Sequence, residues 1–220
     1  MKIGVLGTGV VGKSIASALV KQKHLVRLGS RSATNAKAEA WLQESGDYAS
    51  IGDFDDAAAF GDLLFFCLNG EYALDVAGRL DRDSVHGKVI IDTTNPLDFT
   101  RGLPPRILEG LGNGNSLGEE LQRALPGSFV VKALNTVNHE LMVDARLVNK
   151  GEHNLFICGN NAEAKNKVKH FLVDNFRWKA DRLVDLGPIE ASRVTEAFVP
   201  FWVSIWQHLG TPLFNFKIVR

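Results

Sequence analysis

Short apolar runs alternate with amphipathic segments along most of the chain. The runs that predict strands are residues 2–6, 25–28, 48–52, 63–68, 89–92, 129–133, 155–159 and 183–186. Apolar residues at helical spacing predict helices over residues 10–23, 34–45, 53–60, 71–80, 119–125 and 162–176, with Thr34 as an expected N-cap. This alternation is typical of an α/β fold with a doubly wound, mostly parallel sheet.

The last long segment has the most regular helical pattern. Its apolar positions are Val194, Ala197, Phe198, Phe201, Trp202, Ile205, Trp206 and Leu209. Pro200 should free one carbonyl and kink this helix. The apolar stretch, about twelve residues, is too short to span a bilayer. Its aromatic face should pack on its own sheet, form a dimer interface or line a substrate pocket.

A glycine-rich turn joins the first strand to the first helix. Gly7-Thr8-Gly9-Val10-Val11-Gly12 matches G-x-G-x-x-G between a strand-like run and a helix-like segment. Gly7 would form the tight turn, Gly9 would let the backbone approach a pyrophosphate, and Gly12 would allow close helix–strand packing. A glycine turn without a ligand is the alternative. The order of strand, turn and helix favours a Rossmann-type dinucleotide site, with free N–H groups at the helix start facing the phosphates.

The second strand ends in Gly29-Ser30-Arg31-Ser32, where the nucleotide would be selected. An NAD site carries Asp or Glu about 20 residues after the glycines, and no carboxylate stands between residues 13 and 35. The hydroxyls of Ser30 and Ser32 and the guanidinium of Arg31 suit a 2′-phosphate, which Lys37 lies near enough to join. A solvated arginine is the alternative. The pattern favours NADP(H) over NAD(H).

Further candidates follow the other strands, at the sheet edge where open α/β folds bind ligands. They are Cys67, Leu68 and Asn69 at the carboxyl end of the fourth strand, Asn95 and Pro96 after the fifth, and Ala133 and Asn135 at the end of the sixth. We expect the side-chain amides of Asn95 and Asn135 to hold a bound ring. Residues 97–116, with Pro104, Pro105 and several glycines, are predicted to be a lid or substrate loop.

Acid–base candidates are few. His139 could act as a general acid, although a lone histidine more often caps a helix or faces solvent. Lys132 is the other candidate. The catalytic residue is therefore left open, and no metal site is predicted.

Composition narrows the class of protein. Hydrophobic residues make up 45% and charged residues 23%, as in ordinary globular proteins. A formal net charge of zero argues against nucleic acid or an anionic membrane as a partner. Cys67 and Cys158 lie in apolar runs and are expected to be buried, reduced thiols. The chain starts directly in a core strand, which leaves no room for a signal peptide and predicts a cytoplasmic enzyme.

Four motifs together carry a family resemblance. Gly7–Gly12, Gly29–Arg31, Asn95–Pro96 and Val130–Thr136 resemble the NADPH-dependent reductases of the deazaflavin coenzyme F-420. They are also similar to the cytoplasmic oxidoreductase domain of six-transmembrane ferric reductases. The resemblance covers nearly the whole chain, and it implies a homodimer that transfers hydride from NADPH to a flavin-like ring. The residues at 137–140 and the tail at 215–220 depart from the family pattern.

We therefore predict a single NADP-binding Rossmann domain over residues 1–220, with a small C-terminal helical extension from about residue 188. Its predicted function is hydride transfer between NADPH and a flavin, deazaflavin or similar flat acceptor, which would be the co-substrate. Such a transfer depends on positioning more than on acid–base groups. One alternative is an NADP(H)-sensing regulator that acts on a protein partner. The other is a small hydroxy- or imino-acid dehydrogenase, which would need a Lys, His or Tyr acid at the nicotinamide.

Overall fold

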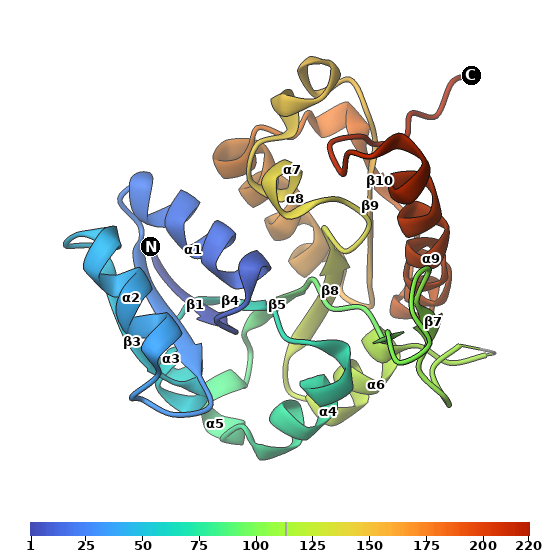
Figure 1. Cartoon of the computed structure of the whole chain (residues 1–220). Coiled ribbons are helices and arrows are strands. Elements are labelled where there is room, and N and C mark those ends of the chain that lie inside the picture. The colour runs from blue at the N-terminus through green and yellow to red at the C-terminus, as the bar shows by residue number, and fades with distance from the viewer. Residues whose placement is uncertain (113) are drawn as a thin grey trace.

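The computed structural model describes residues 1–112 and 114–220. It shows a twisted central sheet with helices on both faces (Figure 1). Within these residues the main sheet has the strand order β10-β9-β8-β5-β4-β1-β2-β3. The strands are β1 Lys2–Leu6, β2 Leu25–Ser30, β3 Ala49–Asp53, β4 Leu63–Phe66, β5 Val89–Asp92, β8 Phe129–Ala133, β9 Leu155–Gly159 and β10 Leu183–Asp185.

Strand direction confirms the predicted, mostly parallel sheet. The strands from β3 to β8 in this order are all parallel, whereas β9 runs antiparallel to β8 and carries β10 parallel to itself. The strand order reverses between β1 and β4. In open α/β sheets, the carboxyl ends of the strands at such a reversal form the ligand crevice.

Helices cover both faces because successive strand residues point in opposite directions. The helices are α1 Val10–Lys21, α2 Ala36–Ser45, α3 Phe54–Phe60, α4 Gly70–Arg79, α5 Arg82–Val85, α6 Leu117–Ala124, α7 His139–Val143, α8 Ala162–Phe176 and α9 Ser192–Leu209. On β4, Leu63 and Phe65 join a core with α1, α2, α7 and α8. Leu64 and Phe66 join a second core with α4, α5 and α6. Burying each such side chain stabilises the fold by about 1.5–3 kcal/mol.

Side-chain caps set where several helices begin. Asn35, not the predicted Thr34, caps α2, because its side chain accepts from the backbone N–H groups of Lys37 and Ala38. Asp53 and Asp56 form a reciprocal capping box at the start of α3. These caps stabilise the turns after β2 and β3, which lie next to the crevice.

The segment 97–116, predicted as a loop, contains a small hairpin. The strands β6 (Leu97–Asp98) and β7 (Arg106–Ile107) pair antiparallel, and β7 lies beside α9 (Figure 1). The predicted loop also includes Asn113, which lies outside the described residues. Its role as a lid stays a prediction.

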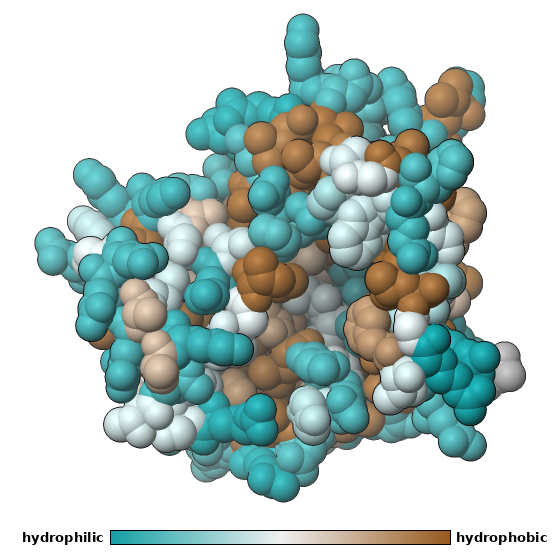
Figure 2. All heavy atoms as spheres, viewed as in Figure 1, coloured by the Kyte–Doolittle hydropathy of each residue, from teal (hydrophilic) through white to brown (hydrophobic). Residues whose placement is uncertain are grey.

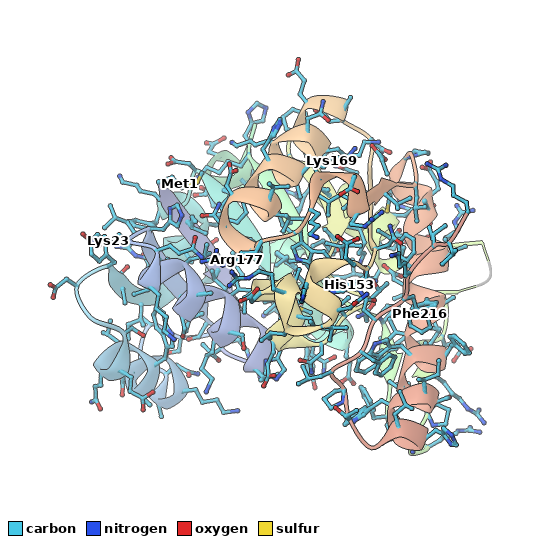
Figure 3. All side chains as sticks on the ribbon, turned by 90° about the horizontal axis from the view of Figure 1, so that it is seen from above. Met1, Lys23, His153, Lys169, Arg177 and Phe216 are labelled. Carbon is cyan, nitrogen blue, oxygen red and sulfur yellow. The ribbon has the colours of Figure 1, made fainter. Side chains whose placement is uncertain are left out.

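The C-terminal helix is α9, and its aromatic face is partly covered by the chain's own tail. Trp202 stacks on Phe214 at 5.0 Å between ring centroids, and Phe198 meets Phe216 edge-on at 4.9 Å. The Asn154 N–H donates to the carbonyl of Phe216 at 2.9 Å, which ties the tail to the start of β9 (Figure 3). The described helix runs through Pro200 without a break.

Candidate active site

The turn between β1 and α1 allows a ligand to approach the backbone closely. Gly7 has a φ of +125°, and a Cβ there would lie 2.3 Å from the carbonyl oxygen of Cys67. A Cβ on Gly12 would lie 1.9 Å from the carbonyl oxygen of Gly7, so α1 packs directly on the turn. Gly9 faces open space, and no side chain among the described residues caps α1. The first N–H groups of α1 can therefore bind an anion.

A cavity of about 570 Å³ opens beside this turn. Arg31 at the end of β2 contacts Tyr72 of α4, with the guanidinium carbon 5.6 Å from the ring centroid. Ser30 is buried, and its hydroxyl donates to the Ser32 carbonyl at 2.5 Å, which stabilises the turn. The lining residues are Gly7, Thr8, Gly9, Ser30, Arg31, Asn35, Ala36, Lys37, Phe54, Cys67, Leu68, Asn69, Tyr72 and Val76. Arg31 and Lys37 make this end cationic, as a phosphate-bearing nucleoside requires.

A second cavity, of about 380 Å³, continues from the first along the strand ends. Its lining residues are Gly9, Val10, Val11, Cys67, Leu68, Asn69, Gly70, Thr93, Thr94, Asn95, Leu97 and Phe99. Because Gly9 and residues 67–69 line both cavities, the two form one cleft. The space-filling view shows a hollow with apolar side chains between the N-terminal half and the side of the molecule that carries α9 (Figure 2).

The two predicted ring-holding amides bind each other. The Asn95 amide donates to the backbone carbonyl of Asn135 at 2.8 Å, and the Asn135 amide donates to Asn95 Oδ1 at 2.9 Å. This pairing fixes the orientation of both amides, so Asn135 Oδ1 points away from Asn95. That oxygen is buried and has no hydrogen-bond donor among the described residues. A buried acceptor without a partner fits a site that a ligand N–H completes.

Lys132 does not have the surroundings of a free general acid. Its side chain is fully buried between Asp92 and Glu196, with Nζ–O distances of 2.7 and 2.8 Å. Burial alone would lower the pKa of Lys132, but the two carboxylates more than reverse this effect, so its pKa is raised. The ammonium therefore stays charged and remains paired with the two carboxylates.

His139 begins α7, outside the cleft. Its Nδ1 lies 2.9 Å from the hydroxyl oxygen of Ser14 on α1. It lines a separate cavity of about 920 Å³ between α1, α2 and α7, which adjoins the cleft only at Val10. The imidazole therefore does not line either cavity of the cleft.

The thiols are free and buried, as predicted. Burial raises the pKa of both Cys67 and Cys158 to about 12. Cys67 is the only titratable side chain among the residues that line the second cavity. That end of the cleft therefore holds no described group that exchanges a proton near neutral pH.

The structure brings most of the predicted residues together. Those that line the cleft are Gly7, Thr8, Gly9, Val10, Val11, Ser30, Arg31, Lys37, Cys67, Leu68, Asn69 and Asn95. Gly12, Ser32, Pro96, Ala133 and Asn135 do not line it directly. Sequence reasoning missed Tyr72, Phe54 and Val76, which come from helices after β3 and β4. Tyr72 follows Asn69 by three residues, and this spacing in the first turn of a helix is the signal that could have found it.

Two absences apply to residues 1–112 and 114–220. Across them, no cluster of three or more His, Cys, Asp or Glu side chains could hold a metal ion. In the same residues, no helix has both the length and the apolar content to cross a bilayer.

Comparison with known proteins agrees with the geometry. The sequence model of the family described as "NADP oxidoreductase coenzyme F420-dependent" matches residues 2–96. The F420-dependent NADP reductase of Methanocaldococcus jannaschii is 33% identical over 213 residues, which cover 93% of this chain and 92% of the reductase. Metalloreductase STEAP3 of Rattus norvegicus is 28% identical over 206 residues, which cover 91% of this chain and 38% of STEAP3.

A solved structure resembles the whole chain. The crystal structure of a protein from Arthrobacter sp. FB24, provisionally named an F420-dependent NADP reductase, covers 100% of both chains with 38% identity and a TM-score of 0.91. The fold and the glycine turn define a Rossmann-type dinucleotide-binding protein. The chain belongs to the family of coenzyme F420-dependent NADP oxidoreductases, and it is an NADP-dependent reductase.

Proposed function

We propose that this protein transfers a hydride between NADPH and a flavin, deazaflavin or similar flat acceptor. The observation that carries the proposal is the second cavity, whose described lining has apolar Leu97 and Phe99 but no side chain that titrates near neutral pH. A flat, apolar ring can stack in such a place. Relatives named as F420-dependent NADP reductases support the same acceptor class.

The residues of the cleft fit NADP(H) when each part of the cofactor is considered. The glycine turn and the start of α1 would hold the pyrophosphate. The 2′-phosphate would be held by Arg31 and Lys37, together with the turn that contains Ser30 and Ser32. Residues 67–69, Asn95 and Asn135 would hold the nicotinamide end, with Pro96 and Ala133 shaping the wall behind it. Gly12 would act through packing. When bound, the dihydronicotinamide supplies the hydride.

The protein's contribution in this proposal is positioning. The Asn95–Asn135 pair fixes the Asn95 amide in the lining of the cleft, and Thr94 is fixed by the Asp92 carboxylate. Well-oriented reactants can recover about 7–11 kcal/mol of a barrier.

Two alternatives are less well supported. A small hydroxy- or imino-acid dehydrogenase needs a proton donor at the nicotinamide. Lys132 is instead held by two carboxylates, and His139 lies outside the cleft. An NADP(H)-sensing regulator would use the exposed aromatic residues of α9, such as Phe201. Catalytic turnover with any acceptor would separate the enzyme from this regulator.

We also propose that the protein is a cytoplasmic homodimer without nucleic-acid or membrane partners. Its formal net charge of zero offers no general attraction for polyanions. The exposed apolar residues of α9 offer a surface for a second copy.

The test of function is NADPH oxidation under anaerobic conditions with matched acceptors. A flavin, a deazaflavin, a ferric chelate and a cyclic imine are compared at equal concentration. We expect the deazaflavin or flavin to give the highest kcat/KM. Turnover of the imine alone would overturn the proposal in favour of the dehydrogenase, and tight NADPH binding without turnover of any acceptor would favour the regulator.

A further inference from the structure

Three charged side chains meet in the interior behind the cleft. Lys132 of β8 lies between Asp92, the last residue of β5, and Glu196 of α9, and all three are almost fully buried. The lysine Nζ also donates to the carbonyl of Thr94 at 2.8 Å. We call these three residues the buried triad. Burying three charges is costly, and a well-packed apolar cluster often stabilises a fold as well or better.

The contacts of the triad determine its charge. Glu196 accepts from the backbone N–H groups of Leu117 and Gly118 at 2.9 Å each, in addition to its ion pair with Lys132. Asp92 Oδ1 accepts from the N–H and hydroxyl of Thr94, at 2.8 and 2.6 Å. Asp92 Oδ2 faces the ammonium as an ion pair that lacks hydrogen-bond alignment. The hydrogen bonds and ion pairs described for both carboxylates come from donors and from the Lys132 ammonium, as acceptor-only carboxylate ions require.

The Lys132 ammonium, in turn, is surrounded by oxygen acceptors. Its neighbours are the Thr94 carbonyl and one oxygen from each carboxylate. One hydrogen bond and two ion pairs therefore surround the ammonium, as a charged lysine requires. The triad therefore carries one net negative charge, which the start of α6 offsets only partly through its N–H groups on Glu196.

This charge lies directly behind the nicotinamide end of the cleft. Thr94, which lines the second cavity, bonds both Asp92 and Lys132. Cys67, on the floor of the cleft, has its pKa raised first by burial and further by the negative charge of Asp92. Asp92 is therefore in direct contact with the cleft lining through Thr94.

We propose that the buried triad favours the oxidised cofactor over the reduced one, and so promotes hydride donation by NADPH. Donation moves two electrons and one proton, as hydride, from the dihydronicotinamide to the acceptor and leaves one positive charge on the nicotinamide ring. A negative charge fixed in a low-dielectric interior stabilises that positive charge without reorganisation. This inference rests on the proposed function, because it requires NADP(H) in the cleft.

A purely structural role makes a different prediction. Glu196 joins α9 to the first turn of α6, so the triad also anchors the C-terminal helix. Loss of an anchor lowers stability and weakens the binding of both cofactor forms alike. Loss of a charge weakens NADP+ binding selectively.

The experiment measures the dissociation constants of NADP+ and NADPH by calorimetry, without any acceptor. The variants are Asp92→Asn and Glu196→Gln, each of which removes one negative charge. Glu119→Gln is the matched control, because Glu119 is also a buried carboxylate that joins α6 to α9, through Arg193, and it has no contact with Lys132 or Thr94 among the described residues.

We expect Asp92→Asn to weaken NADP+ relative to NADPH by at least about threefold, as a charge at moderate distance implies. Glu196→Gln should shift the ratio in the same direction by less, because the N–H groups of α6 already offset its charge. The Glu119→Gln control should keep the wild-type ratio of the NADP+ and NADPH dissociation constants. An unchanged ratio in both variants, or an equal shift in the control, would overturn the proposal.

The outcomes also separate this inference from the proposed function. If wild type binds neither cofactor form, the proposed function fails. If wild type binds both forms and the variants keep its ratio, only the triad inference fails. Should Asp92→Asn not fold, Glu196→Gln decides alone, because the amide oxygen of that variant can still accept from one of the two N–H groups at the start of α6.

Discussion

Cofactor preference depends on single residues at the end of β2. The Arg31 guanidinium lies against Tyr72, on the cationic side of the cleft, and no carboxylate lines that cavity among the described residues. An NAD site needs such a carboxylate for the ribose 2′-hydroxyl. The side chains present instead suit a 2′-phosphate.

Arg31→Ala should therefore remove most of the preference for NADPH. We expect wild type to bind NADPH at least about tenfold more tightly than NADH, which corresponds to about 1.4 kcal/mol. Fluorescence titration with both cofactors measures the preference. Arg79→Ala is the control, since Arg79 is a nearby exposed cation paired with Asp75 and lies outside the nucleotide cavity. Equal affinities of wild type for the two cofactors would refute the assignment.

His139→Ala should leave a working enzyme. The imidazole bonds Ser14 and lies outside the cleft, so its loss removes a contact between α1 and α7 and no proton donor. Single-turnover NADPH oxidation with the best acceptor is the measurement, and we expect the rate to stay within about tenfold of wild type. A loss of about 10³-fold in this rate is typical of a missing general acid or base, and it would favour the hydroxy- or imino-acid dehydrogenase instead.

The two thiols should resist alkylation in the native state. A pKa of about 12 for Cys67 and Cys158, against an ordinary 9.0, lowers the reactive thiolate fraction at pH 8 by about 10³-fold. Iodoacetamide labelling at pH 8 should be slow in native protein and fast for both thiols in denaturant. Rapid native labelling of Cys67 would mean that the cleft lining opens to solvent, and rapid labelling of Cys158 would mean that the core around β9 opens.

At this scale, the sequence predicted residues whose roles are local. Gly7 and Arg31 are recognisable because their neighbours in sequence define the turn. The unpartnered oxygen of Asn135 was not predictable, because it results from a bond to Asn95 across 40 residues. The same is true of Lys132, whose partners come from β5 and α9.

Among the elements, the strands of the main sheet and most helices followed from hydrophobic spacing, whereas the hairpin of β6 and β7 did not. The helix α9 was predicted, but its buried apolar residues are Val199, Trp202 and Val203, whereas Val194, Phe201 and Leu209 of the predicted stripe are exposed. What covers the helix was not predicted. The tail at residues 211–218 folds back because Phe214 and Phe216 fit aromatic gaps on α9. A pattern within one helix does not specify such a partner.

Phe216→Ala should destabilise the protein by about 2 kcal/mol, since the ring packs against Phe198, Phe201 and Phe214 in a partly exposed cluster. Urea unfolding followed by tryptophan fluorescence measures the loss. Val219→Ala is the matched control, because Val219 is 85% exposed in the same tail and should change stability by less than about 0.5 kcal/mol. Equal stability of both variants would mean that the tail does not hold α9 in solution.

For the whole molecule, we propose that the chain is one domain. One hydrophobic core runs from Ile3 on β1 to Leu183 on β10, across both parts of the sheet. Shared burial of this kind makes unfolding cooperative, so the wild-type urea curves should show a single transition by fluorescence and circular dichroism. Two separated transitions would divide the N-terminal half from the rest.

The exposed side of α9 leads to the last prediction, that two copies associate. The tail covers Trp202, but Phe201 remains 54% exposed and Leu209 52% exposed. Because apolar patches on a monomer are rarely left in water, a two-fold interface that pairs α9 with its counterpart would bury them. Wild type should therefore sediment as a dimer at micromolar concentration.

Phe201→Glu combined with Leu209→Glu should convert that dimer into a monomer, because the carboxylates would be buried without partners. Tyr48→Glu, next to β3 at the opposite edge of the sheet, adds a similar charge to an exposed ring and should leave the dimer intact. Sedimentation velocity distinguishes these states. A wild-type protein that sediments at its monomer mass of 24.1 kDa would contradict the proposed interface.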